Sequence, residues 1–100
     1  MIKTKELEDY LNFKREELCK TKEILNEYLL TKNKLIEQQD ILELELVNNN
    51  SNIDSKLYSE RLDKCLLELL GLNNEILYTK ELIENIEYDI EMCEKDLQAI

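Results

Sequence analysis

The residues able to do chemistry in this chain are carboxylates and three cysteines. Glu87 and Glu91 lie four residues apart, which on a helix places both carboxylates on one face, within reach of a divalent cation. The same spacing is typical of solvated surface residues, so we expect no metal site. Cys19, Cys65 and Cys93 are widely spaced and odd in number, which fits neither a disulfide framework nor a CxxC motif. We therefore expect free, reduced thiols, with Cys19 as the one plausible reactive thiol.

Other catalytic machinery is excluded by composition. The chain contains no histidine, which removes His-based acid–base catalysis, Ser-His-Asp triads and His metal ligands. Gly71 is the single glycine, so neither a phosphate-binding loop nor a dinucleotide-binding fingerprint can be formed. We expect a protein that is not an enzyme and that uses no cofactor.

Charge and hydropathy limit the partners. A net charge of -10 argues against direct binding of nucleic acid or of anionic membranes. No uncharged apolar run approaches the ~20 residues needed to span a bilayer, and residues 1–9 lack the apolar centre of a secretory signal. A cytoplasmic location is expected. Plentiful Asn, Lys and Ile, with a single Gly and no Pro, are typical of AT-rich genomes such as those of low-GC bacteria or their phages.

The elements that position these residues are predicted to be helices. Leu, Glu and Lys are good helix formers, and charged residues make up 36% of the 100 residues, which leaves little material for a thick globular core. In the second half a Leu or Ile recurs every seven residues, at positions 62, 69, 76, 83, 90 and 97. Three residues behind each lie Cys65, Leu72, Thr79, Ile86, Cys93 and Ile100. These are the a and d positions of a heptad repeat, the signature of a coiled coil.

The first half follows the same repeat less strictly. Its a positions are 11, 18, 25, 32, 39 and 46, and its d positions are 7, 14, 21, 28, 35 and 42. Four of these are polar: Lys14, Thr21, Lys32 and Gln39. Polar residues in the seam lower stability but can fix register and partner. The sequence thus predicts one helix over about residues 4–47 and a second over about 54–100.

A polar run between the halves predicts a bend. Residues 48–53 interrupt the heptads with four asparagines and a serine, and asparagine tolerates the left-handed conformation that ends helices. Ser51 and Asp54 are N-cap candidates for the second helix. The predicted fold is a single all-α domain: a long antiparallel two-helix coiled-coil hairpin that assembles into a dimeric four-helix bundle or docks on a partner.

Folding the chain about residue 52 predicts which residues face each other. Leu11 meets Cys93, and Leu42 meets Leu62. Arg15 comes near Glu87 beside the seam, and Lys22 comes near Lys80, which is a poor match of charge.

Apolar residues outside the seam predict an interaction surface. A helix that is apolar beyond its seam usually has a second neighbour. The expected interface residues are Leu29, Ile36, Leu66, Leu67, Leu70, Leu77 and Tyr78. The partner is either a second copy of the chain or another protein, and the function is that of a structural or adaptor module.

An acidic patch supports an alternative function. It consists of Glu84, Glu87, Asp89, Glu91, Glu94 and Asp96. Such a patch could occupy a basic nucleic-acid-binding surface of a target protein, as an acidic inhibitor, for example a phage-encoded one, would do. A third possibility, the dimerisation arm of a longer DNA-binding protein, requires a natural chain that continues past Ile100.

Overall fold

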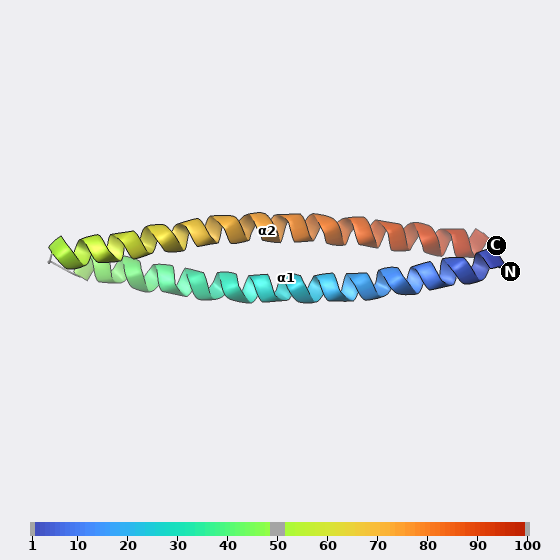
Figure 1. The fold of residues 1–100 in the computed structure, drawn as a ribbon, viewed down its shortest axis with the longest axis horizontal. Helices are drawn as coiled ribbons and strands as arrows, with labels where there is room; N and C mark the ends of the chain where they lie inside the picture. Colours follow the sequence, from blue (N-terminus) through green and yellow to red (C-terminus); the bar gives the residue numbers. More distant parts are fainter. Residues whose placement is uncertain (1, 49–51, 100) are drawn as a thin grey trace. The chain divides into compact units, whose positions relative to one another are not determined.

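The protein is an all-α helical hairpin, as the heptads predict. A computed structural model describes residues 2–48 and 52–99, and the side chains of residues 3–48 and 55–99. Helix α1 covers Ile2–Asn48 and helix α2 covers Asn52–Ala99, and neither described segment contains a strand (Figure 1). Two helices of this length need many good helix formers and no internal proline, and both conditions are met.

The boundaries of the helices differ slightly from the prediction. Helix α1 begins earlier than residue 4, and helix α2 begins at Asn52 rather than at residue 54. The predicted bend is therefore too long, because Asn48, Asn52 and Ile53 are helical. Residues 49–51, including the expected cap Ser51, and the side chain of Asp54 lie outside the described part of the chain.

The chain divides into two compact units, which we describe separately. The terminal unit consists of Met1–Asn26 and Leu77–Ile100, and the central unit of Glu27–Ile76. In each unit a segment of α1 lies antiparallel beside a segment of α2 (Figure 1).

In the central unit the seam holds a small apolar core. Leu35, Cys65 and Leu69 are buried, and the half-buried Leu42 and Leu72 pack against them. The Cys65 thiol donates a hydrogen bond of 3.3 Å to the backbone carbonyl of Leu35 on the opposite helix. Burial raises the pKa of this thiol, with a smaller contribution from the Glu68 carboxylate. Cys65 therefore packs as a small neutral side chain.

In the terminal unit the seam follows the same heptads. Its buried residues, all at a or d positions, are Leu11, Thr21, Thr79, Ile83, Ile86 and Cys93. The Cys93 thiol donates a hydrogen bond of 3.3 Å to the Leu7 carbonyl, which lies one turn before Leu11. This contact places Cys93 beside Leu7, one helical turn before its expected neighbour Leu11. Thr21 satisfies its hydroxyl within α1, by donating to the Glu17 carbonyl at 2.7 Å.

The prediction of which residue lies near Arg15 is wrong by one heptad. The Arg15 guanidinium pairs with Glu94 at 3.2 Å rather than with Glu87. Side chains on a helix lean toward its N-terminus. In antiparallel helices Arg15 and Glu94 therefore lean toward each other, whereas Arg15 and Glu87 lean apart.

Candidate interaction surface

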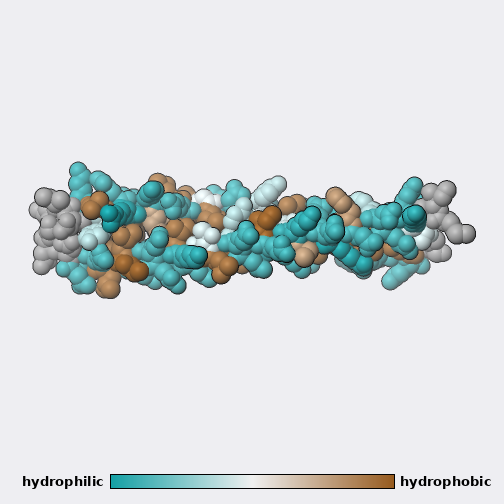
Figure 2. Space-filling model, turned by 60° about the horizontal axis from the view of Figure 1, so that its bottom comes forward, coloured by the Kyte–Doolittle hydropathy of each residue, from teal (hydrophilic) through white to brown (hydrophobic). Residues whose placement is uncertain are grey.

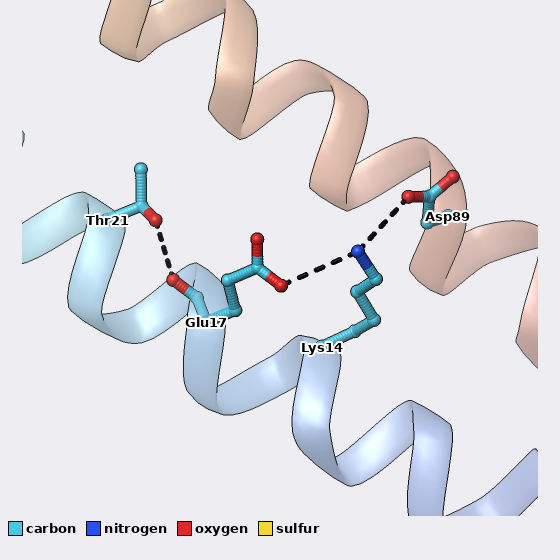
Figure 3. A network of polar contacts seen from close by, with 4 residues as sticks. All are labelled: Lys14, Glu17, Thr21 and Asp89. Atoms are coloured by element: carbon cyan, nitrogen blue, oxygen red, sulfur yellow. Dashed lines mark hydrogen bonds and ion pairs between the residues drawn. The ribbon is translucent and has the colours of Figure 1, made fainter.

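A network of polar contacts is built around Lys14, in the seam of the terminal unit. Its Nζ lies 3.5 Å from the Glu17 carboxylate on α1 and 3.5 Å from Asp89 on α2 (Figure 3). The ammonium also lies 5.6 Å from the centre of the Tyr10 ring. Lys14 is thus a polar seam residue whose charge is directed to the edge of the interface.

Two opposing effects set the pKa of Lys14. Burial against the seam acts to lower it, while the charges of Glu17 and Tyr10 and the hydrogen bonds that Lys14 donates to Asp89 and Glu17 act to raise it. The result is a raised pKa, so the lysine keeps its charge. From the sequence Lys14 was expected only as a polar seam position. A glutamate three residues later was the available signal of a local ion pair.

The acidic patch is partly neutralised. Asp89 pairs with Lys14 and Glu94 pairs with Arg15, both across to α1. Glu91 pairs with Lys95 along α2 at 3.3 Å. Glu84, Glu87 and Asp96 are exposed on the same helix. Asp96 also lines a surface hollow together with Lys3 near the start of α1.

The central unit carries an apolar surface beside its seam. At the e, f and b heptad positions of α2, Leu66, Leu67 and Leu70 are 42%, 69% and 60% exposed. On α1, Ile36 occupies an e position and Leu30 an f position, and both are exposed. Figure 2 shows apolar side chains in brown, scattered among hydrophilic ones on the part of the molecule next to the grey bend residues.

Three of the expected interface residues differ in their setting. Leu29 is half-buried against the seam, so it can contribute only part of its surface. Leu77 and Tyr78 are exposed, but both belong to the terminal unit. Leu66, Leu67, Leu70 and Ile36 therefore form the part of the expected interface that one compact unit presents.

The asparagines beside these leucines were not noticed in the sequence. Asn33 on α1 and Asn73 and Asn74 on α2 occupy b, e and f positions and are exposed. Together with Leu29, Leu30, Ile36, Leu66, Leu67 and Leu70 they make what we call the uncharged face. No e, f or b position carries a charge between residues 29 and 36 of α1, or between residues 66 and 74 of α2. The signal that could have found it was this interruption in a chain with 36% charged residues.

A groove lies on the opposite flank of the central unit. Its volume is about 350 Å³, and its apolar lining residues are Ile41, Leu42 and Cys65. It is also lined by Gln38 and by the charged residues Arg61, Lys64 and Glu68, which carry charges of both signs. This mixed charge contrasts with the uncharged face.

The described residues contain neither a group of His, Cys, Asp or Glu suited to a metal ion nor a helical stretch able to cross a bilayer. Cys19 is an exposed thiol, whereas Cys65 and Cys93 are buried.

No family model, no curated protein and no solved structure matches this chain.

Proposed function

We propose that the protein is a structural or adaptor module that acts by self-association through the uncharged face of its central unit. The observation that carries the proposal is the exposure of Leu66, Leu67 and Leu70 on one flank of α2. Contiguous apolar surface rimmed by polar residues is typical of a protein–protein interface. Removing such side chains from water stabilises an association by about 25 cal/mol per Å² of apolar area buried.

The total surface of the chain supports the same proposal. One copy exposes 7777 Å². A compact protein of 12.0 kDa would expose only about 6,000 Å². The excess surface, some of it apolar, favours a second packing partner over a monomer as the working state. Two hairpins packed face to face would form a four-helix bundle, in which each helix buries more than its seam.

Action as an acidic inhibitor is the second candidate function. Its candidate surface is the acidic patch, where Asp89 and Glu94 are already paired with cations of α1. A basic target would have to compete with these pairs. The two functions differ in salt dependence, because added salt screens an acidic-to-basic contact and leaves an apolar one intact or stronger.

A pair of matched substitutions tests the proposal. Leu66 and Leu57 are leucines of α2 with nearly equal exposure, 42% and 44%, but Leu57 occupies an outward c position away from the uncharged face. Leu66→Glu should dissociate the assembly to a mass near 12.0 kDa, because a carboxylate would be buried without a partner. Leu57→Glu should leave the mass unchanged. Light scattering after size exclusion measures both variants.

Either of two results would contradict the proposal: a wild-type protein that stays monomeric at all concentrations, or loss of assembly in the Leu57 variant alone. Circular dichroism of each variant checks that the helices persist.

A further inference from the structure

We propose that a hollow between the two helices of the terminal unit binds an arginine side chain of a basic partner protein. The inference goes beyond the proposed self-association and does not rest on it, because the hollow belongs to the terminal unit and the uncharged face to the central unit. The evidence is the set of tyrosines, methionine and carboxylates that surrounds the hollow.

The hollow has a volume of about 290 Å³. Its lining includes Tyr10 on α1 and Tyr88, Asp89, Met92 and Asp96 on α2. We call it the tyrosine hollow. Pockets for drug-sized ligands have volumes of ~300–1,000 Å³, so this hollow suits a single side chain.

Apolar surface is exposed around the tyrosine hollow. The side chains of Tyr10, Tyr88 and Met92 are all exposed, although each is large and mainly apolar. Tyrosine and methionine are enriched in protein–protein interfaces, and so is the arginine that we place against them. The terminal unit thus presents a small surface with the composition of an interface.

The charges of the tyrosine hollow select a cation. Among the described residues that line it, only Asp89 and Asp96 are charged. Lys14 already pairs with Asp89 (Figure 3), whereas Asp96 forms no ion pair within the described part of the chain. Lys3 lines a neighbouring hollow with Asp96 but does not pair with it. Asp96 is therefore the carboxylate open to a cation from outside, and the net charge of -10 attracts a basic partner from a distance.

Lys14 shows that a cation is held beside one of these tyrosines. Its Nζ lies 5.6 Å from the centre of the Tyr10 ring and 3.5 Å from the Asp89 carboxylate. A cation near the face of an aromatic ring is attracted by the negative charge of that face. Tyr88 has no such cation against its ring among the residues that the structure describes. The Tyr88 ring and the Asp96 carboxylate are therefore left for a second cation.

Arginine fits this hollow better than lysine. The guanidinium group is flat, so it can stack on a tyrosine ring while two of its N–H groups donate to one carboxylate. Its methylene stem can pack against the Met92 side chain. A lysine ammonium is a compact, strongly hydrated charge that cannot make the stacked and the two-pronged contact together.

A peptide titration tests the site. The chain has two methionines, Met1 and Met92, so a sample with isotope-labelled methionine methyl groups gives an NMR signal from within the hollow. The probe is a blocked peptide with one arginine between glycines, compared with peptides in which lysine or citrulline replaces the arginine. Citrulline has nearly the shape of arginine but no charge. The arginine peptide should shift the Met92 signal to saturation and bind at least ~3-fold more tightly than the lysine peptide, and the citrulline peptide should not saturate.

Two matched pairs of variants locate the binding. Tyr88→Leu should weaken binding of the arginine peptide at least ~3-fold, and Tyr78→Leu should not, even though these two tyrosines of α2 are almost equally exposed, at 62% and 64%. Asp96→Asn should weaken binding at least ~3-fold as well. Asp63→Asn removes the same charge from the central unit and should leave the affinity unchanged. Circular dichroism of each variant checks that the helices persist.

Three results would overturn the proposal. The first is the absence of a saturable shift with the arginine peptide. The second is equally tight binding of the lysine or citrulline peptide, because charge or apolar contact alone would then be recognised. The third is an equal loss in the Tyr78 and Asp63 variants, which would indicate attraction to the acidic chain as a whole.

One further variant separates this inference from the proposed function. Leu66→Glu should dissociate the proposed assembly, yet it should bind the arginine peptide as the native chain does, because Leu66 belongs to the central unit. A native chain that is monomeric but binds the peptide would contradict the self-association alone. A native chain that assembles but does not bind the peptide would contradict this inference alone.

Discussion

At the scale of single residues, the polar groups of the seam are satisfied in ways that leave the hairpin intact. Lys14 directs its charge to Glu17 and Asp89, and Thr21 bonds the backbone of its own helix. The Cys65 and Cys93 thiols donate to carbonyls of the opposite helix. Each of these groups would cost free energy if it were buried without a partner. The seam therefore tolerates them while they help to fix its register.

Cys65 should make the free energy of unfolding depend on pH in the alkaline range. Burial raises its pKa above the ordinary value of 9.0, so the neutral thiol is favoured in the folded state. Its contribution is fully present below about pH 9, where the unfolded thiol is also neutral, and is lost as pH rises through the folded pKa. The free energy of unfolding should fall as the pH rises above about 9 and through the raised pKa of the folded state, and that of the Cys65→Ala variant should fall less steeply. Urea titrations at several pH values measure the difference. Equal slopes would show that the thiol is not desolvated.

At the scale of the helices, the seam supplies most of the packing. Ile86 is the most buried large side chain of the described residues, with 2% of its surface exposed. Ile86→Ala should lower the free energy of unfolding by about 2–4 kcal/mol, through lost apolar contact and the cavity left behind. Leu67→Ala, at a position 69% exposed, serves as the control. In a monomeric sample it should change the free energy of unfolding by less than about 0.5 kcal/mol. Denaturant titrations at protein concentrations too low for association compare the free energies of unfolding of the two variants. Equal effects of the two variants would refute the seam.

Gly71 is a weak point within α2. It lies at an outward position, and a Cβ added there would meet no atom within 4 Å. Its backbone has no positive φ that would favour glycine. Gly71→Ala should therefore raise the free energy of unfolding by about 0.5–1 kcal/mol. Because the position is off the uncharged face, the dissociation constant should not change, which sedimentation velocity can check. Weaker association in this variant would place an interface at Gly71 instead.

At the scale of the whole molecule, the helical pairing was predictable and the surface only in part. The heptads from Leu62 onward have a period that admits one buried stripe, so the seam could be read from the sequence. The ion-pair partner of Arg15 could not be read from the sequence. Heptad spacing fixes which residues lie level on the two helices, but not the direction in which long side chains point. The half-burial of Leu29 depends on how closely the two helices pack at that level.

The candidate surface was predicted from apolar and aromatic residues alone. The prediction included the exposed Leu66, Leu67 and Leu70, because apolar residues outside a seam indicate a second neighbour. Asn33, Asn73 and Asn74 were missed, since polar residues on a helix surface are ordinary until charges are seen to be absent around them. The arrangement of both helices was needed to show that the uncharged stretches lie on one flank.

Sedimentation equilibrium of the native chain, at low and at high salt, tests the central claim most directly. The account predicts a mass twice that of the 12.0 kDa chain at both salts, with a dissociation constant that holds or falls as salt rises. A mass of one chain at every accessible concentration would contradict it.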